Sequence, residues 1–300
     1  MPSSPRELDP RARDGSGLSV VVNPTAGPAL GASLTEQIAE AVPAATVREL
    51  DEHDDLLDVL RDAARSPVLG VAGGDGTINA ATGIALETDR PLLVIPGGTL
   101  NHFARDLGVD TIDAAIDAFH RGRLHRIDVG RIDGRPFLNT ASIGGYPELV
   151  DERERLEGRL GKWLALAVAM VRVTRRIEPT LLTIDGVDRD VWLIFVGNCV
   201  YDPPGLAPRS RSTLDDGRFD VRYLDAGARS RSKVFLALLT GQLGRTSAYR
   251  RVVTDRLDIT SRQGPLRLAR DGETFDGGVD IVIEKDPVGL DVFLPAEADR

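Results

Sequence analysis

The chain has 300 residues, 42% apolar and 28% charged, with a formal net charge of −9. This length and composition allow a buried core of one large domain or two ordinary ones and exclude wholesale disorder. The acidic balance and the low aromatic content of 5% argue against a nucleic-acid partner. The only cysteine, Cys199, excludes an internal disulfide and a cysteine-based zinc cluster.

The first part of the chain is predicted to alternate strands with helices. Residues 1–17 have no apolar signal-peptide segment and are expected to form a flexible arm. Strands are predicted over 18–22, 45–47, 67–72 and 91–95, and helices over 30–41, 54–64, 78–86, 101–107 and 111–120. Such alternation indicates a parallel sheet with helices packed on it.

After about Arg123 the pattern changes to antiparallel β-structure. Asp133-Gly134 and Asp185-Gly186 each lie between two strand-like runs and predict hairpins. Strands are predicted over 127–132, 135–139, 181–184, 190–196, 218–224 and 281–284, and helices near 149–176 and 231–244. The longest apolar run, 163–171, is about half of the ~20 residues that span a membrane. We therefore predict a cytoplasmic protein.

The strongest local motif is the Gly-rich stretch Gly73–Thr77, between a predicted buried strand and a helix. Glycines allow a sharp turn and close approach to a ligand, and the first N–H groups of a helix bind anions. The alternative is a tight turn with a capping Asp or Thr. Similar turns at Asn23–Gly27 and Pro96–Asn101 also follow predicted strands. We expect all three at one sheet edge, around a polyphosphate.

Seven short stretches of the sequence occur in a characteristic order. They are Val22–Gly27, Gly73–Asn79, Pro96–Arg105, Phe137–Gly144, Val196–Asn198, Leu214–Gly217 and Asp271–Glu273. Each stretch is a weak signal alone, and Asp271–Glu273 by itself is more typical of a surface turn. Together they span about residues 18 to 285 in the family's order, and the sequence resembles the diacylglycerol kinase catalytic-domain family, which includes bacterial lipid kinases and sphingosine kinases.

The resemblance implies a fold and an activity. It implies a Rossmann-like nucleotide-binding α/β domain over 18–124, to which 286–300 returns, then a β-sandwich domain over 125–285, with the active site in the interdomain cleft. It also implies a lipid kinase of phospholipid biosynthesis. This enzyme would use ATP and Mg²⁺ to phosphorylate the hydroxyl of diacylglycerol or a related lipid alcohol, docked peripherally on the inner membrane face.

The resemblance also assigns roles to residues. Glu273 would be the general base, and Asp75 is our candidate for the catalytic Mg²⁺ contact. Asp216 would bind a structural Mg²⁺ with the backbone carbonyls of Thr213 and Arg218. ATP contacts are expected from Asn23, Pro24, Thr25, Ala26, Gly27, Gly73, Gly74, Asp75, Gly76, Thr77, Ile78, Asn79, Gly98, Thr99 and Asn101.

The sequence departs from the family pattern at several positions. His102 and Ala80 stand where many members have Asp and Glu, and a Thr often found in the second strand–helix connection has no clear match around 48–50. His102 could place a cation near phosphate or pack on Phe103. The alternatives to a lipid kinase are an NAD kinase-like phosphotransferase and a catalytically silent nucleotide- or lipid-binding protein. The acceptor lipid and the oligomeric state, a homodimer included, stay open.

Overall fold

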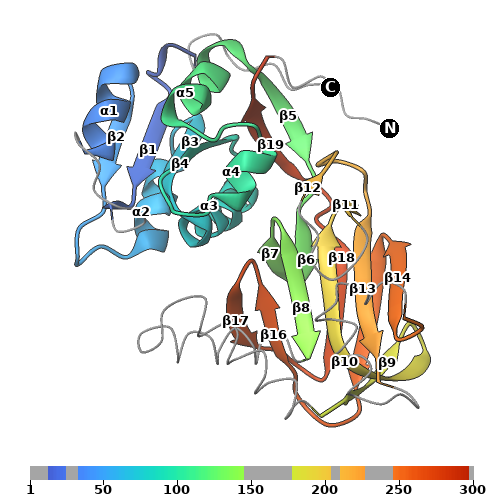
Figure 1. The fold of residues 1–300 in the computed structure, drawn as a ribbon. Coiled ribbons are helices and arrows are strands. Elements are labelled where there is room, and N and C mark those ends of the chain that lie inside the picture. Colours follow the sequence, from blue (N-terminus) through green and yellow to red (C-terminus); the bar gives the residue numbers. More distant parts are fainter. Residues whose placement is uncertain (1–12, 25–32, 145–177, 204–209, 227–245, 297–300) are drawn as a thin grey trace, which may run out of the picture. The chain divides into compact units, whose positions relative to one another are not determined.

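The computed structural model describes residues 13–24, 33–144, 178–203, 210–226 and 246–296. The chain divides into two compact units (Figure 1). Unit 1 comprises residues 1–129 and 286–300, and unit 2 comprises residues 130–285. Residues 13–17, predicted as part of a flexible arm, are tied to unit 1, because Arg13 Nη1 donates a hydrogen bond to the backbone carbonyl of His120.

Unit 1 is built on a six-stranded sheet with the order β2-β1-β3-β4-β19-β5. The central strands are apolar except for Ser19 in β1, and all their residues are buried, as expected for parallel strands covered on both faces. The C-terminal strand β19 runs parallel to β4, and β5 pairs antiparallel with β19. The strands are β1 (Leu18–Val22), β2 (Thr46–Glu49), β3 (Val68–Gly73), β4 (Leu92–Pro96), β5 (Arg123–Ile127) and β19 (Leu290–Leu294).

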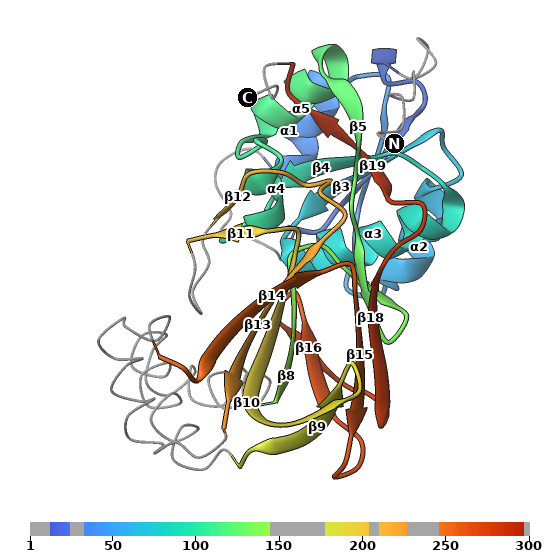
Figure 2. The ribbon, with the colours of Figure 1, turned by 90° about the vertical axis from the view of Figure 1, so that its right-hand side faces the viewer.

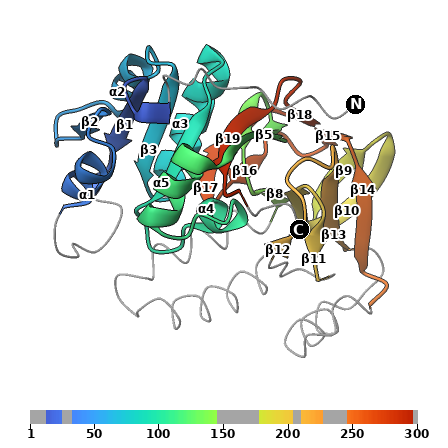
Figure 3. The ribbon, with the colours of Figure 1, turned by 90° about the horizontal axis from the view of Figure 1, so that it is seen from above.

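Helices cover both faces of this sheet (Figure 3). Three of them begin at side-chain caps: Ser33 for α1, Asp55 for α2 and Thr111 for α5. The first residue before α3 is Gly74, which makes no side-chain capping bond. The helices are α1 (Leu34–Ala41), α2 (Leu56–Ala63), α3 (Asp75–Thr88), α4 (His102–Asp106) and α5 (Ile112–Arg121).

Unit 2 is an antiparallel sheet that curls around its own core (Figure 2). Its main path is β17-β16-β8-β10-β9-β15-β18-β6-β7, with β13 and β14 added beside β10. The strands are β6 (Gly130–Ile132), β7 (Arg135–Phe137), β8 (Thr140–Gly144), β9 (Thr180–Ile184), β10 (Val187–Asn198), β13 (Phe219–Asp225), β14 (Tyr249–Thr254), β15 (Arg256–Ser261), β16 (Arg267–Arg270), β17 (Glu273–Asp276) and β18 (Asp280–Lys285). A two-stranded ribbon of β11 (Tyr201–Asp202) and β12 (Ser210–Arg211) is separate.

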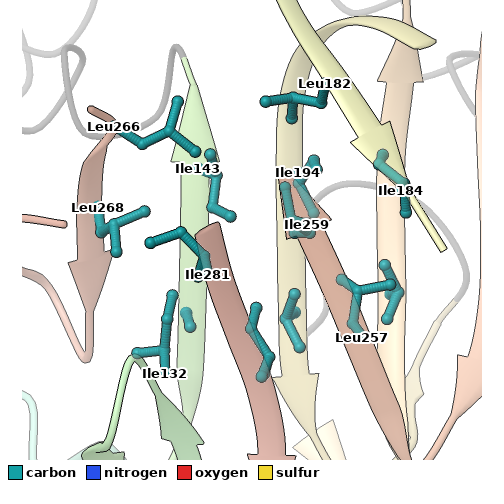
Figure 4. Close-up of a cluster of buried hydrophobic side chains, with 14 of the residues drawn as sticks. Ile132, Ile143, Leu182, Ile184, Ile194, Leu257, Ile259, Leu266, Leu268 and Ile281 are labelled. Atoms are coloured by element: carbon teal, nitrogen blue, oxygen red, sulfur yellow. The ribbon is translucent and has the colours of Figure 1, made fainter. Parts of the chain in front are cut away.

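The long strand β10 makes the curl possible. Its first half pairs with β9, and its second half pairs with β8 and β13, with a register shift between Val191 and Leu193. Apolar side chains from both halves of the sheet fill the space between them, Ile143 and Leu268 from one half and Ile184 and Leu257 from the other (Figure 4). The α/β domain followed by a β-sandwich-like domain is the fold class that the sequence predicts.

One predicted element is wrong. Residues 127–132 do not form a single strand, because β5 ends at Ile127 in one sheet and β6 begins at Gly130 in the other. A Cβ at Gly130 would lie 2.3 Å from the Phe137 ring, so the close packing of β6 on β7 requires glycine there. The helices predicted near 149–176 and 231–244 and the apolar run 163–171 lie outside the described residues. Among the residues described, no helix is long and apolar enough to cross a membrane.

Candidate functional site

The three predicted turns of unit 1 come together at the carboxyl ends of β1, β3 and β4. These strands are neighbours, and all are parallel. Asn23 donates from its backbone N–H to Ala72 O at 2.8 Å and from Nδ2 to Thr77 Oγ1 at 2.9 Å. Gly97 N donates to Gly73 O at 3.0 Å. We call the described residues of these turns, 23–24, 73–77 and 97–101, the turn cluster.

The glycines of the turn cluster bring backbone against backbone. A Cβ on Gly98 would lie 2.6 Å from Gly74 Cα, and a Cβ on Gly97 would lie 3.0 Å from Gly73 Cα. None of these four glycines has a positive φ. Their small size therefore serves the contact between two turns, which leaves the first turn of α3 close to the Gly97–Asn101 turn.

The N-terminus of α3 is the part of the turn cluster suited to an anion. The helix has 14 residues, and its N-cap residue is Gly74. Glycine has no side chain that could accept hydrogen bonds from the first N–H groups of the helix. Asp75 does not cap the helix, so the alternative interpretation of the motif as a turn capped by Asp75 is wrong. Its Oδ1 accepts the backbone N–H of Phe103 at 3.4 Å, which links the start of α3 to α4.

The other predicted nucleotide contacts differ in exposure. Ile78 is fully buried and belongs to the core, and Asn79 is 3% exposed. Asn79 Oδ1 is buried and has no hydrogen-bond partner within the described part of the chain. Thr99 is exposed, and Asn101 bonds both backbone groups of Gly98 at 2.8 Å. Thr25, Ala26 and Gly27 lie outside the described residues, and His102 is exposed at the start of α4.

In unit 2 the predicted Asp271–Glu273 turn is hydrogen-bonded to residues 138–140, which are distant from it in the sequence. Asp271 Oδ2 accepts the N–H of Leu138 at 2.7 Å, and Oδ1 accepts those of Asn139 and Thr140 at 2.8 and 2.9 Å. Burial raises the pKa of the Asp271 carboxyl, and the three N–H bonds oppose that rise. Glu273, two residues on, is exposed at the start of β17. These bonds anchor the turn to residues 138–140, and we call them the Asp271 clamp.

Further polar side chains join this clamp to other stretches of the motif set. Arg211 Nη1 donates to the carbonyls of Leu138 and Asn198, both at 2.8 Å. Lys285 Nζ donates to Asn198 Oδ1 at 2.7 Å and lies 4.5 Å from the centre of the Phe219 ring. We call Asp271, Arg211, Asn198 and Lys285 the polar network. The first three bond the connection between β7 and β8, and Lys285 is joined to it through Asn198.

Asp216 also bonds backbone groups. Its Oδ2 accepts Val200 N at 2.9 Å, and its Oδ1 accepts Arg218 N at 2.8 Å. The Arg218 carbonyl, a predicted metal ligand, accepts Cys199 N at 2.9 Å, and Thr213 is exposed. Carboxylate and carbonyl oxygens suit Mg²⁺, and each retains a second lone pair. The structure gives Asp216 a role without metal, as a link between the end of β10 and the start of β13.

The chain is similar in sequence to known kinases. Residues 17–132 match the family described as the diacylglycerol kinase catalytic domain. A diacylglycerol kinase of Staphylococcus saprophyticus is 32% identical over 67% of this chain and 70% of its own length. A probable YegS-like lipid kinase of Pseudomonas savastanoi is 30% identical over 75% of each chain. The Bacillus subtilis diacylglycerol kinase is 38% identical, over 51% of this chain and about half, 53%, of its own length.

Two of these relatives are named diacylglycerol kinases and one a probable lipid kinase, so the class of protein to which they belong is the lipid kinases. The chain belongs to the diacylglycerol kinase catalytic-domain family.

Solved structures agree on the fold. A putative diacylglycerol kinase from Bacillus anthracis superimposes with a TM-score of 0.70 at 24% identity, covering 92% of this chain and 96% of that one. An NAD kinase from Archaeoglobus fulgidus, solved in complex with ATP, gives a TM-score of 0.50 at 14% identity, covering 93% and 94%. At these identities both likenesses concern the fold, a parallel α/β sheet followed by a curled antiparallel sheet.

The sequence prediction missed the cations of unit 2. Arg211, Arg270 and Lys285 were not singled out, although Lys285 is one of only three lysines in the chain. Because lysine is so rare in this chain, a lysine at the end of a strand indicates a specific contact, and this signal was present in the sequence. Arg211 carried no comparable signal, since its contacts are with carbonyls of residues 13 and 73 positions away.

Proposed function

We propose that this protein is an ATP- and Mg²⁺-dependent lipid kinase that transfers the γ-phosphoryl group of ATP to the hydroxyl of diacylglycerol or a related lipid alcohol. The observation that carries the proposal is the turn cluster, in which three strand-ending turns meet at the uncapped N-terminus of a long helix. Its occurrence in a chain of this family favours a nucleotide as the ligand. A structural relative of unlike sequence, the Archaeoglobus fulgidus NAD kinase, is described in complex with ATP.

Unit 1 carries the residues that we propose to bind the nucleotide. The N–H groups in the first turn of α3 and the positive end of its dipole favour a triphosphate. Asn23 and Thr77 are held together by a hydrogen bond, which orients both polar side chains at this edge of the sheet. Asn79 Oδ1 offers a buried acceptor to a donor group of the nucleotide.

Unit 2 carries the proposed general base, Glu273. In the proposed reaction the lipid hydroxyl oxygen attacks the γ-phosphorus, the bond from that phosphorus to the β,γ-bridging oxygen breaks, and ADP leaves. Glu273 takes the hydroxyl proton, because a carboxylate within hydrogen-bond reach assists a poor alcohol nucleophile. Asp271 contributes by fixing the hairpin that presents Glu273.

The metal assignments remain proposals. Mg²⁺, when bound with the triphosphate, would supply positive charge that stabilises the transferring group. Asp75 is the acid of the turn cluster suited to contact that ion, and its Oδ1 is oriented by Phe103 N. A structural Mg²⁺ at Asp216, with the carbonyls of Thr213 and Arg218, would have to share oxygens that already accept N–H groups.

We propose that the enzyme acts from the cytoplasm by peripheral contact with the inner membrane face.

A transfer assay separates this function from its alternatives. The full chain is incubated with γ-labelled ATP, Mg²⁺ and either mixed lipid alcohols in detergent micelles or NAD, and products are identified by mass spectrometry. A phosphorylated lipid is expected. Label on NAD alone would assign an NAD kinase activity, and ATP binding without any transfer would indicate a silent binding protein.

The variant E273Q tests the proposed base. We expect it to reduce transfer about 100-fold or more while ATP binding is kept, because general acid–base catalysis contributes about 10²–10⁴-fold. D276N is the matched control, since Asp276 is an exposed carboxylate on the same strand. Equal losses in E273Q and D276N would remove the special role of Glu273.

A further inference from the structure

The last residue of the turn cluster, Asn101, is the N-cap residue of α4 but does not cap that helix. An asparagine at this position normally accepts a hydrogen bond from a backbone N–H in the first turn of the helix. The Asn101 side chain makes no such bond. Its φ and ψ are 48° and 46°, in the left-handed region, whereas an N-cap residue is typically extended. The Asn101 side chain therefore has a role other than capping α4.

The Asn101 side chain bonds Gly98 instead. Oδ1 accepts the backbone N–H of Gly98 at 2.8 Å, and Nδ2 donates to the backbone carbonyl of Gly98, also at 2.8 Å. A primary amide carries a donor and an acceptor side by side, so it matches the two polar groups of one residue. The left-handed backbone that this arrangement requires is one that asparagine adopts more readily than most residues. Asn101 thus closes the turn, and Thr99 and Leu100 inside it are exposed.

The acceptor that α4 does not receive from Asn101 comes from α3. Asp75, the first residue of α3, accepts the backbone N–H of Phe103 at 3.4 Å. Phe103 is the second residue of α4, and its N–H is one of the two that an N-cap side chain normally accepts. Asp75 therefore bonds the start of α4 in place of Asn101, and the Asn101 amide bonds Gly98.

Gly98 is the residue at which this turn packs against α3. A Cβ on Gly98 would lie 2.6 Å from the Cα of Gly74, which is the N-cap residue of α3. The neighbouring Gly97 N–H donates to the carbonyl of Gly73 at 3.0 Å. A movement of Gly98 would therefore change the contact with the residue that directly precedes the first N–H groups of α3. Those N–H groups are the ones suited to bind a phosphate.

We propose that Asn101 is a positioning residue for the nucleotide, which acts through Gly98 by holding the Gly97–Asn101 turn against the N-terminus of α3. The proposal rests on the proposed function for the identity of the ligand. It differs from the role that the sequence predicts, in which Asn101 contacts ATP directly. The two roles predict different behaviour when ATP binds. A direct ligand would exchange a bond to Gly98 for a bond to ATP, whereas a positioning residue keeps both bonds to Gly98.

The first test removes the two bonds and keeps the backbone conformation. N101G deletes the side chain, and glycine adopts the left-handed region without steric cost. D89G is the matched control, because Asp89 follows α3 in the same unit with φ and ψ of 51° and 47°. Without nucleotide, the Gly98 N–H of N101G should exchange with solvent about tenfold or more faster than in wild type, as measured by NMR. Equal exchange rates in N101G and D89G would contradict the proposal.

The second test uses the wild type, so it does not depend on the folding of a variant. The bond from Asn101 Nδ2 to the Gly98 carbonyl is followed through the NMR scalar coupling across the hydrogen bond, in protein labelled with ¹³C and ¹⁵N. This coupling should be present without nucleotide and should persist when ATP is saturating. Its loss on addition of ATP would show that Asn101 leaves Gly98 for the nucleotide, and the positioning role would be refuted.

Affinity then connects the turn to the nucleotide. N101G should bind ATP about tenfold or more weakly in calorimetric titration, as for the loss of two neutral hydrogen bonds, and D89G should stay near wild type. In the transfer assay, N101G should raise the KM for ATP by the same factor and leave the KM for the lipid unchanged. Unchanged ATP affinity beside faster Gly98 exchange would refute the positioning role.

The proposed function can fail separately. If the wild type binds ATP but transfers no phosphate to any lipid, the lipid kinase activity is refuted, and the ATP affinity of N101G still decides the role of Asn101. If the wild type binds no ATP at all, both proposals are refuted. The exchange rate of the Gly98 N–H then reports only whether Asn101 holds the turn closed.

Discussion

The turn cluster of unit 1 and the polar network of unit 2 are held together in different ways. In the turn cluster, glycines allow turns to pack backbone on backbone, and the polar contacts join residues of adjacent strands. In the polar network, charged side chains bond backbone groups far away in sequence, as Asp271 does 131 to 133 positions away. The first arrangement depends on the absence of side chains and the second on particular charges, so substitutions should affect them differently.

The largest effect is expected at Asp220, a fully buried carboxylate of β13 that supports the start of β11. Arg222 donates to it at 2.6 Å, Arg251 donates to both oxygens, and Tyr201 N donates at 3.1 Å. D220N leaves a buried cation without its charge partner and should lower the free energy of unfolding of unit 2 by about 3–5 kcal/mol. Urea unfolding followed by Trp192 fluorescence in a W163F background measures it. A loss no larger than that of D258N, an exposed Asp paired with Arg256, would contradict the prediction.

We also expect the contribution of Asp220 to the free energy of unfolding to depend on pH. Burial alone would raise the pKa of Asp220, but hydrogen bonds from Arg222 and Arg251 outweigh it, and the pKa is lowered. A lowered carboxyl pKa stabilises the fold above the unfolded value of about 3.9, and this contribution is lost as pH falls through the folded value. The difference in unfolding free energy between wild type and D220N should therefore stay constant down to about pH 5 and narrow below about pH 4. A constant difference down to pH 3 would be inconsistent with this assignment.

The next largest effect is expected among three Asp-Gly turns with the same backbone conformation, at Asp133-Gly134, Asp185-Gly186 and Asp271-Gly272. Asp271 accepts three backbone N–H groups, Asp185 accepts one from Asp258, and no bond to the side chain of Asp133 is present among the described residues. The Asn variants should therefore destabilise unit 2 in the order D271N, D185N, D133N, by about 2–3, 1 and 0 kcal/mol. Urea unfolding of the three variants measures the series. Equal values would mean that turn conformation alone governs these positions.

This series also explains what the sequence could and could not predict. All three Asp-Gly pairs look alike locally, and each does form a turn with positive φ at both residues. Only the fold places residues 138–140 against Asp271, so its clamp could not be inferred from the turn signal. The glycine motif Gly73–Thr77 was predictable as a strand-to-helix turn because its signal is local. Gly73 packs against Thr77, which is also local, but the contacts of Gly73 and Gly74 with Gly97 and Gly98 depend on strand order.

A smaller effect is expected from filling the contact within the turn cluster. In G98A the new Cβ would lie 2.6 Å from Gly74 Cα and 2.9 Å from Asn101 Oδ1, so the two turns must separate. We expect a loss of about 1–3 kcal/mol in the stability of unit 1, as for other overpacked positions, and weaker ATP binding. Thermal unfolding and calorimetric titration with ATP measure both. G278A is the control, because its Cβ would have no neighbour nearer than 3.5 Å. Equal effects of the two variants would show that the turns tolerate the extra atom.

The smallest perturbation uses the only cysteine as a reporter of unit 2. Cys199 is fully buried next to Asn198, and burial raises its pKa to about 12, while the nearby Lys285 ammonium acts in the opposite direction. Since the thiolate is the reactive form, labelling at pH 8 should be slower than for a free thiol by on the order of a thousandfold. K285M removes the nearby cation and the bond to Asn198, so it should loosen this end of β10 and speed labelling through local opening. K233M provides a matched lysine control. If K285M labels no faster than K233M, the polar network does not hold the end of β10, and its link to the Asp271 clamp is weaker than its hydrogen bonds imply.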